Sequence, residues 1–343
     1  MAMAAHPSLI IPAIPAEKVG FKSTNSSADE EAPKDKMVVS CTSHRGSTAG
    51  VLLLPEFSNK HIVLGGRYEY EDSIDAMIGM GAFGIVFKGE DTVTNASVAI
   101  KRIPKLNVKE NELKMIRSLK SDYLVGVLDI CRMDDVTCCL VMELCDSDLD
   151  QHMRNVSTQG RLSPSNFRTL LDNIARGYKA LYEMKIVHRD IKPQNILVSY
   201  RNHSPSQIAV ARITDFGIAR TLDDEQGAEL CNVAGTFYYM APEVGANLLK
   251  TCQYDFKVDM WSIGCLLYQC VAGEVPFEEG YLCRLFLYTA CANYEAYDLP
   301  EIPSTVDPEV VKIIHSLLAI DPSFRCNPTQ FYNRATNWSQ SIH

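Results

Sequence analysis

The chain has 343 residues, of which 46% are hydrophobic and 22% are charged, a composition typical of a globular protein large enough to form two lobes. Its formal net charge of -9 argues against nucleic acid or an anionic membrane surface as the main partner, since an acidic surface repels both. No stretch of the sequence reaches the roughly 18 apolar residues that a transmembrane helix needs, so we expect no membrane span.

The cysteines and the first residues both favour an intracellular protein. The 12 cysteines form no C-x-x-C pair, and several, such as Cys265 and Cys270, lie in apolar runs where a reduced thiol packs as a small hydrophobic group. The opening stretch "MAMAAHPSLIIPAIPAEK" has no basic region, and prolines interrupt its apolar residues, unlike a secretory signal. We therefore predict an intracellular, cytoplasmic location.

The pattern along the chain predicts two unequal lobes. Residues 1–64 are rich in Ala, Pro, Ser and mixed charge without a helical or strand period, so we expect a largely disordered extension. Strand-like pieces predominate over 65–145, with one helix expected near 108–120. The pattern over 146–335 is mainly helical, and 336–343 form a short tail.

Two helices of the second lobe are the most clearly marked. In "LSPSNFRTLLDNIARGYKALYEM", Ser163 suits the N-cap and Pro164 the first helical position, and apolar residues recur on one face. The run "VDMWSIGCLLYQCVAG" is apolar nearly all round and stops at Gly273. This pattern predicts a buried helix.

Three glycines, Gly79, Gly81 and Gly84, have the spacing G-x-G-x-x-G in "IGMGAFGIVFKG". At about 7% glycine, this spacing arises by chance in roughly one chain of this length in ten, so the glycines alone decide little. A dinucleotide-binding motif would be followed by a helix, whereas strand-forming residues follow here. The sequence favours a glycine-rich hairpin lying over phosphates, where bare backbone can approach the oxygens closely.

Lys101 ends the strand-like stretch "VAIK", where it could reach the phosphates of a nucleotide as a compact positive charge. A buried ammonium needs a carboxylate opposite it, and the expected helix offers Glu110 and Glu112. We choose Glu112 because apolar residues share its helical face, which indicates that this face points inward. An exposed helical glutamate is the alternative.

The stretches "HRDIKPQN" and "DFG" carry two carboxylates, an amide and a lysine in an order that fits metal-assisted phosphoryl transfer. Asp190 would accept the proton of the attacking hydroxyl, and Lys192 would neutralise the transferring group. Asn195 and Asp215 would supply oxygen ligands to Mg2+, which prefers hard oxygen donors. His188 is better explained as a packed core residue than as an acid or base.

In these motifs the chain resembles the eukaryotic protein kinases over about residues 66–335. The ordered set is G-x-G-x-x-G-x-V, VAIK, HRD-x-K-P-x-N, DFG and APE. The resemblance implies an α+β, bilobal kinase fold with a kinase domain at 65–335, a small antiparallel-sheet N-lobe with one helix, and a larger, mainly helical C-lobe. It also implies ATP and Mg2+ as cofactors and proteins as substrates.

The resemblance also assigns roles to individual residues. Met142 would be the gatekeeper, and Asp259 would anchor the catalytic loop from the buried helix. Glu243 would pair with Arg325. The residues implied to line the nucleotide site are Ile78, Gly79, Gly81, Gly84, Val86, Ala99, Lys101, Met142, Glu143, Cys145 and Leu197, with backbone groups of Glu143 and Cys145 offered to adenine.

The motifs further resemble the serine/threonine group. Lys192 lies where these kinases carry a lysine, and Thr236, in "GTFYYMAPE", would hydrogen-bond near the catalytic aspartate and lysine. Several stretches resemble the unc-51-like, autophagy-initiating kinases, and some, such as "LDDEQ", resemble the TANK-binding and IKK-epsilon type. The resemblance thus implies an ATP-dependent serine/threonine protein kinase. The alternatives are a pseudokinase-like scaffold and a small-molecule kinase of similar fold.

Three features depart from the usual kinase pattern. Eleven positions separate Lys101 from Glu112, so the helix is expected to lack its first turn and to need an activating partner protein that presses it inward. No obvious activating phosphosite lies between Asp215 and Glu243, and acidic residues there would neutralise Arg189 instead, or remain solvated. Those acids are Asp223, Asp224, Glu225 and Glu229.

The third departure is the segment "CDSDLD", which lacks the paired glycines of many relatives. It places Asp146, Asp148 and Asp150 near the expected substrate groove. One of them would contact ribose or a basic residue of the substrate, and plain solvation is the alternative.

Overall fold

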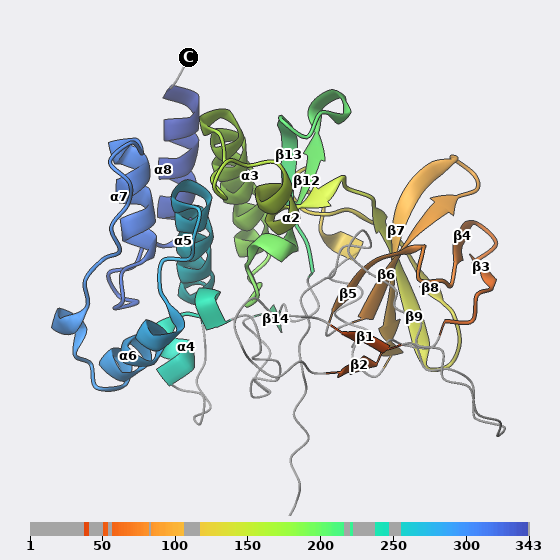
Figure 1. The fold of residues 1–343 in the computed structure, drawn as a ribbon, viewed down its shortest axis with the longest axis horizontal. Helices are drawn as coiled ribbons and strands as arrows, with labels where there is room; N and C mark the ends of the chain where they lie inside the picture. Colours follow the sequence, from red (N-terminus) through yellow and green to blue (C-terminus); the bar gives the residue numbers. More distant parts are fainter. Residues whose placement is uncertain are drawn as a thin grey trace, which may run out of the picture.

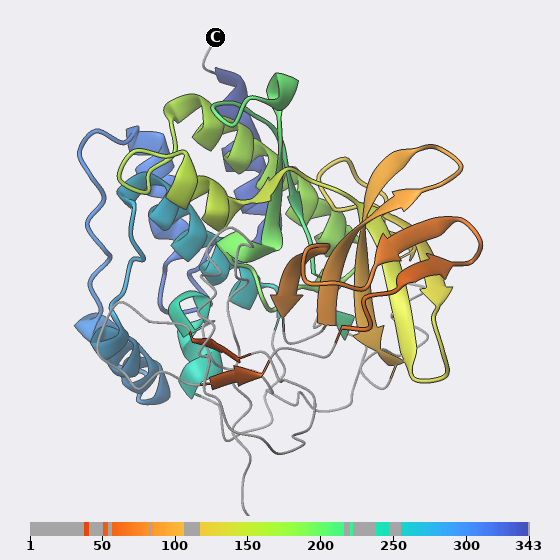
Figure 2. The ribbon, with the colours of Figure 1, turned by 45° about the vertical axis from the view of Figure 1, so that its right-hand side comes forward.

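A computed structural model of the chain describes residues 38–40, 51–53, 57–81, 84–105, 117–215, 220–221, 237–246 and 255–341. The described residues form a smaller lobe built on a β-sheet and a larger lobe of helices, and Figure 1 shows the two side by side. They remain side by side in the turned view of Figure 2. The predicted α+β class, with an antiparallel-sheet lobe and a helical lobe, is confirmed. None of the described helices combines the length and the apolar surface that a transmembrane span requires.

One antiparallel sheet forms the smaller lobe. Its strands are β3 (His61–Leu64), β4 (Tyr68–Glu71), β5 (Met77–Gly81), β6 (Gly84–Asp91), β7 (Ala96–Pro104), β8 (Val127–Arg132) and β9 (Thr137–Glu143). Their order is β3-β4-β6-β7-β9-β8, with β5 paired to β6. Because β3 pairs along its whole length with β4, the sheet begins ahead of position 65, where the sequence placed the start of this lobe.

Successive residues of the central strand β7 lie on opposite faces of the sheet. Val98 and Ile100 are buried on one face, where they pack with Phe87 of β6 and Val141 of β9. Lys101 lies on the other face, since side chains alternate along a strand. The apolar core of the N-lobe therefore decides on which side of the sheet the lysine lies.

The larger lobe is mainly helical. Its helices are α2 (Leu149–Asn155), α3 (Pro164–Glu183), α4 (Pro242–Ala246), α5 (Lys257–Ala272), α6 (Glu279–Ala290), α7 (Pro308–Leu317) and α8 (Pro328–Ser341). As predicted, Ser163 caps α3 by accepting the N–H of Asn166 on its Oγ (3.3 Å). Helix α5 is buried on nearly all sides and ends at Gly273, whose left-handed φ of 88° suits glycine.

A small sheet of three strands lies between the main sheet and the helices (Figure 1). It contains β10 (Ser147–Asp148), β12 (Ile196–Tyr200) and β13 (Ile208–Ile213). Strands β12 and β13 form a hairpin in which Ile196 lies opposite Ile213, and the N–H of Thr214 then donates to the carbonyl of Asn195 at 2.9 Å. This ladder brings Asn195 and Asp215 to the same end of the hairpin.

Two isolated strand pairs complete the described fold. Strand β11 (Ile186–Val187) pairs with β14 (Arg220–Thr221), just ahead of the loop that carries Asp190. Strand β1 (Val38–Ser40) pairs with β2 (Val51–Leu53), inside the stretch that the sequence predicts to be largely without regular structure. The other residues of that stretch up to position 56 lie outside the described residues.

Helix α8 continues past position 335, where the sequence placed the end of the C-lobe. The hydroxyl of Ser339 donates to Asp172 of α3 at 2.9 Å, and the ring of Trp338 packs edge-on against Phe167. Helices α3 and α8 lie next to each other along their length (Figure 1). Residues 336–341 of the stretch predicted to be a tail thus belong to a helix packed against α3.

Candidate active site

Lys101 and Asp215 come from different lobes and contact each other. Lys101 lies on β7, and Asp215 follows the end of β13. The Nζ of Lys101 donates to the Oδ1 of Asp215 at 2.7 Å, and the two side chains are 11% and 24% exposed. Asp215 has a left-handed φ of 66°, which is uncommon for residues other than glycine and recurs at functional sites. The structure therefore brings together these two groups, 114 positions apart in the sequence.

Asp190, Lys192 and Asn195 form one bonded group in the loop between β11 and β12. The Nζ of Lys192 lies 2.8 Å from the Oδ2 of Asp190. The Nδ2 of Asn195 donates to the same Oδ2 at 2.9 Å and to the backbone carbonyl of Asp190 at 2.7 Å. Asp190 is 5% exposed and Asn195 is 6% exposed. A cation and an amide thus hold a buried carboxylate in one orientation.

Helix α5 anchors this loop through Asp259. The carboxylate, 0% exposed, accepts the backbone N–H groups of His188 (2.6 Å) and Arg189 (2.7 Å) and the hydroxyl of Tyr178 (2.7 Å). Burial raises the pKa of Asp259, although the neighbouring His188 and the three hydrogen bonds oppose that shift. The predicted anchoring of the catalytic loop by Asp259 is confirmed.

His188 packs in the core, as the sequence predicts, and is 0% exposed. Its Nε2 lies 2.8 Å from the carbonyl oxygen of Thr214, and its Nδ1 lies 3.3 Å from the backbone nitrogen of Asp190. Because a carbonyl only accepts hydrogen bonds, this network assigns the ring proton to Nε2 and leaves Nδ1 as the acceptor. The ring ties the loop of Asp190 to the segment that carries Asp215.

The strand register places five of the eleven predicted nucleotide residues on one face of the N-lobe sheet. Val86 lies opposite Lys101 across β6 and β7, and Ala99 lies opposite Met142 across β7 and β9. Gly79 lies opposite Val86 across β5 and β6. Residues directly opposite one another share a face, and so do Ala99 and Lys101, two positions apart on one strand. Together these residues form a continuous surface on the side of the lysine.

The protein constrains its three motif glycines differently. Gly84 has a φ of 145°, and a Cβ there would clash with the carbonyl oxygen of Arg102, so only glycine fits. A Cβ on Gly79 would make an ordinary contact of 3.8 Å with Val86, and one on Gly81 would meet no described atom within 4 Å. Packing therefore explains Gly84 but not Gly79 or Gly81, whose missing side chains leave the hairpin bare.

Glu143 and Cys145 lie where the chain leaves β9 for the C-lobe. The N–H of Glu143 donates to the carbonyl of Gly126 at 3.0 Å, so this N–H is not available to a ligand. The carboxylate of Glu143 lies 3.5 Å from the guanidinium of Arg212 on β13. Burial raises the pKa of the Cys145 thiol.

The remaining predicted nucleotide residues, Ile78 and Leu197, come from opposite lobes. Ile78 lies at an irregularity in the pairing of β5 and is 41% exposed. Leu197 lies on β12, two positions after Asn195, and is half-buried. Each lobe thus contributes one apolar residue to the predicted nucleotide site.

The three aspartates of the segment "CDSDLD" each have a partner within the protein. Asp146 accepts the N–H of Tyr200 at 2.7 Å, and Asp148 caps α2 by accepting the N–H of Gln151 at 2.8 Å. Asp150 lies 2.6 Å from Arg154 in the same helix. These contacts give each aspartate a structural role of its own.

Several predicted residues lie outside the part of the chain that the structure describes. These are Glu112, Thr236, Asp223, Asp224, Glu225 and Glu229. The ion pair of Lys101 with Glu112, the role of Thr236 and the neutralisation of Arg189 by the acidic residues therefore stay predictions.

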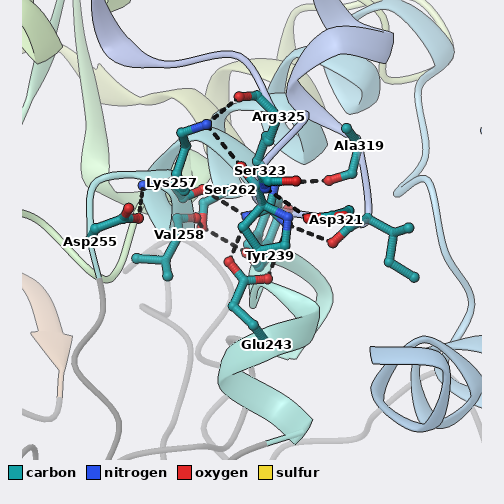
Figure 3. Close-up of polar contacts among 12 residues, drawn as sticks. Tyr239, Glu243, Asp255, Lys257, Val258, Ser262, Ala319, Asp321, Ser323 and Arg325 are labelled. Carbon is teal, nitrogen blue, oxygen red and sulfur yellow. Dashed lines mark hydrogen bonds and ion pairs between the residues drawn. The ribbon is translucent and has the colours of Figure 1, made fainter. Parts of the chain in front are cut away.

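Glu243 of α4 pairs with Arg325, as the resemblance implies. The Nη1 and Nη2 atoms of Arg325 donate to the two carboxylate oxygens at 2.6 and 3.0 Å. Its other N–H groups donate to the carbonyls of Lys257, Ala319 and Ile320 at 2.8, 2.9 and 3.2 Å, and Figure 3 shows the arginine at the centre of these contacts. All five N–H groups of a side chain that is 0% exposed are satisfied, which joins α4 to the start of α5 and to the residues after α7.

The side chains at the end of the β12–β13 hairpin fit a magnesium ion. The Nδ2 of Asn195 is used on Asp190, so Oδ1 is the atom of this amide that remains for a ligand. Asp215 adds a carboxylate, and amide and carboxylate oxygens are donors that Mg2+ prefers. Lys101 supplies positive charge, and the bare hairpin supplies room, for the phosphates that such an ion accompanies.

Tyr178 and Thr214 contribute to the site, but the sequence did not point to either of them. Tyr178 lies on the apolar face of α3, and a hydroxyl on a buried face needs a partner, so this pattern is a signal that could have found it. Thr214 acts through its backbone carbonyl and N–H. No signal in the sequence marks a backbone group.

A model of the protein kinase domain family matches residues 73–336. The human serine/threonine-protein kinase ULK1 is 34% identical over 282 residues, which cover 78% of this chain and 25% of ULK1. The serine/threonine-protein kinase unc-51 of Caenorhabditis elegans is 35% identical, covering 77% of this chain and 31% of its own length. The serine/threonine-protein kinase atg1 of Dictyostelium discoideum is 31% identical, covering 76% and 38%.

The chain therefore spans between a quarter and two fifths of these relatives. They support the resemblance to the unc-51-like kinases and give no support to the likeness to the TANK-binding and IKK-epsilon type. The family match covers most of the chain and includes the lobes that bring Lys101, Asp190 and Asp215 together. The chain belongs to the protein kinase domain family.

Proposed function

We propose that this chain is an ATP-dependent serine/threonine protein kinase, which transfers the γ-phosphate of Mg-ATP to hydroxyl groups of protein substrates. One observation carries the proposal: Lys101 of the N-lobe contacts Asp215 at 2.7 Å, at the end of the hairpin that also bears Asn195. A protein that served only as a scaffold would have no chemical need to hold these charged groups together between its lobes.

Asp190 is the group that would accept the proton of the substrate hydroxyl. Lys192 and Asn195 hold its carboxylate in a fixed orientation, and a positioned base typically contributes about 10²–10⁴ in rate. Lys192 also places a positive charge beside the point of attack, where it would neutralise the transferring group. When bound, Mg2+ would neutralise charge on the phosphate oxygens, with Asn195 and Asp215 as its protein ligands.

Two findings support Ser/Thr hydroxyls as acceptors. The contact of 2.8 Å between Lys192 and Asp190 places the lysine of the motif typical of these kinases next to the proposed base. The three relatives described above are named serine/threonine-protein kinases. We propose the same acceptor class for this chain.

The test is the transfer of a labelled γ-phosphate from Mg-ATP to a degenerate peptide array. We expect labelling of Ser and Thr peptides but not of Tyr peptides, and a loss of about 10²-fold or more in the Asp190→Asn variant. Transfer that persists in this variant would remove Asp190 from its role. No transfer by the unmodified chain, while Mg-ATP still raises its melting temperature, would favour a scaffold that binds nucleotide without catalysis.

The short distance along the chain between Lys101 and Glu112 supports a need for an activating partner protein that presses the N-lobe helix inward. Inserting one helical turn ahead of Glu112 should then raise the activity of the isolated chain. A matched insertion of the same length in the β12–β13 turn should leave it unchanged. Equal activity of the unmodified protein and the first variant would contradict this proposal.

We also propose the limits of the domain and its location. The family match over 73–336 supports a kinase domain close to the predicted limits of 65–335, to which the structure adds β3 at one end and the last residues of α8 at the other, and an extension precedes it. The described cysteines are all free, and most of them are buried, which supports an intracellular location.

A further inference from the structure

Residues 57–64, which we call the docking segment, consist of β3 and the four residues ahead of it, and they pair with β4 and with Asp72. The N–H of Asn59 donates to the carbonyl of Asp72, and the N–H of Asp72 donates to the carbonyl of Lys60, both at 2.9 Å. The backbone pairing of β3 with β4 therefore continues toward the N-terminus of the chain. The docking segment lies ahead of residue 73, where the family match begins.

Ser58 binds the side chain of Asp72. Its backbone N–H and its hydroxyl both donate to the Oδ2 of Asp72, at 3.1 and 2.7 Å. Asp72 is 5% exposed, whereas Ser58 is exposed to solvent. The hydroxyl of an exposed serine thus satisfies one oxygen of a buried carboxylate.

Arg102 of β7 binds the other oxygen of Asp72. Its Nη1 donates to Oδ1 at 2.9 Å, and its guanidinium lies 4.9 Å over the ring of Phe87. Phe57 of the docking segment meets the same ring edge-on, with the centroids 6.3 Å apart. Asp72 therefore joins the docking segment to the strand in which Lys101 is the neighbour of Arg102.

We propose that Ser58 is a phosphorylation site and that a phosphoryl group there releases the docking segment from the N-lobe. The donor is ATP, acting with a serine/threonine protein kinase. The Oγ of Ser58 forms a bond to the γ-phosphorus, the bond from that phosphorus to its bridging oxygen breaks, and ADP leaves. The hydroxyl proton passes to the base of the modifying kinase.

Phosphorylation would turn the attraction between Ser58 and Asp72 into repulsion. Phosphoserine carries a charge of about -1.5 to -2 at pH 7, and its oxygens mainly accept hydrogen bonds. The carboxylate of Asp72, now 2.7 Å from the Oγ, would then face a like charge in place of a donor. Arg102 already binds the other oxygen, Oδ1, and its guanidinium lies over Phe87, so we expect it to stay there rather than move between the two anions. The repulsion displaces the docking segment.

Release of the docking segment would affect Lys101 through its neighbour Arg102 on β7. Without Ser58 and Phe57, Asp72 keeps only the bond from Arg102, and the ring beneath Arg102 loses its edge contact. Arg102 then has fewer constraints, and Lys101 is the next residue of the same strand. We expect weaker binding of Mg-ATP as a result; this second step rests on the proposed function, whereas the release itself does not.

The direct test compares the unmodified chain with protein carrying phosphoserine at position 58, introduced at an amber codon, by hydrogen–deuterium exchange. We expect amides of the docking segment and of Asp72 to exchange at least roughly tenfold faster in the modified protein, because the buried carboxylate has lost both donors of Ser58. Equal or slower exchange in the docking segment would overturn the proposal.

Ser58→Asp and Ser58→Asn form a matched pair that differs in charge and hardly in size. The aspartate should speed exchange in the docking segment, and the asparagine should leave it within about twofold of the unmodified protein. Adding Asp72→Asn to Ser58→Asp should restore protection, since it removes the repulsion. Equal effects of the two substitutions, or no rescue, would contradict the charge mechanism.

Two further measurements separate this proposal from the proposed function. A dissociation constant for Mg-ATP that is unchanged by phosphoserine, despite faster exchange, would reject the link to Lys101. Absence of phosphoryl transfer by the unmodified chain, with faster exchange still present in the modified protein, would reject the kinase activity and support the release.

Discussion

Asp259 and the backbone of Arg189, which are 70 positions apart in the sequence, are joined by a hydrogen bond of 2.7 Å. The same carboxylate binds the N–H of His188 and the hydroxyl of Tyr178. The catalytic loop is therefore attached to α5, the helix buried on nearly all sides, and not only to the strands beside it. The position of Asp190 depends on this attachment.

Removing the anchor should affect both stability and catalysis. Asp259→Ala leaves two N–H groups and a hydroxyl without their acceptor, and we expect the free energy of unfolding to fall by about 3 kcal/mol or more. Tyr178→Phe removes one donor only and should cost about 1 kcal/mol. Urea denaturation of both variants measures the difference. Equal losses in the two variants would show that the backbone contacts of Asp259 contribute little.

Substitutions of two glycines in the β5–β6 hairpin should affect different properties, stability for Gly84 and nucleotide binding for Gly81. Gly84→Ala forces a Cβ against the carbonyl of Arg102 at a φ of 145°, so we expect a loss of about 2 kcal/mol or more. Gly81→Ala has no described neighbour within 4 Å and should change the free energy of unfolding by less than about 0.5 kcal/mol.

Gly81→Ala, which should hardly change stability, should weaken nucleotide binding. Its added methyl group would occupy the bare face of the hairpin, so we expect the KM for ATP to rise several-fold while the melting temperature stays unchanged. Thermal denaturation and steady-state kinetics on the same preparation test this. An unchanged KM would argue that the phosphates do not lie under Gly81.

Buried and exposed ion pairs should differ sharply in their contribution to stability. Glu243→Ala leaves Arg325, whose side chain is 0% exposed, without its carboxylate, and we expect a loss of about 3–5 kcal/mol. The pair of Lys312 with Glu309 is 68% and 62% exposed, so Lys312→Ala should cost less than about 1 kcal/mol. Chemical denaturation of the two variants provides the comparison, and a mild effect of Glu243→Ala would contradict the structural role of the pair.

The carboxylate of Asp72 should make stability depend on pH. Burial raises its pKa, but the hydrogen bonds from Ser58 and Arg102 outweigh this and hold the pKa below its ordinary value of 3.8. A lowered pKa in the folded state stabilises the protein above the ordinary value, and this contribution disappears as the pH falls through the folded-state pKa. The difference in free energy of unfolding between the natural protein and Asp72→Asn should therefore be largest near pH 7 and shrink below about pH 4. A difference that stays constant from pH 7 to pH 3 would contradict a stabilising role of the ionised Asp72 carboxylate.

The sequence predicted that Lys101 and Asp215 lie together, because the order and spacing of the motifs encode it. Lys101 and Asp215 lie in short stretches whose order identifies the family, and Ser163 marked a helix start through local chemistry. The run of α5, apolar nearly all round, predicted its burial for the same reason. These features depend on neighbours in the sequence.

The features that the sequence did not predict depend on distant partners. Ser58 lies in a polar stretch with no period, and its hydrogen bond to Asp72 becomes visible only when the two segments meet. The extension of α8 beyond position 335 likewise depends on the contact of Ser339 with Asp172, 167 positions away. Glu112 and Thr236 lie outside the described residues, so the structure leaves those two predictions as they were.

The β12–β13 hairpin holds the two proposed metal ligands at a fixed distance from each other. Asn195 and Asp215 leave the same end of one antiparallel ladder, tied together by the bond from Thr214 to Asn195 at 2.9 Å. Lys101 belongs to the other lobe, so any hinge motion between the lobes would alter its distance from both ligands while their mutual spacing stays constant. Such a motion would change the contact of Lys101 with the phosphates of a bound nucleotide and leave the positions of the two metal ligands unchanged.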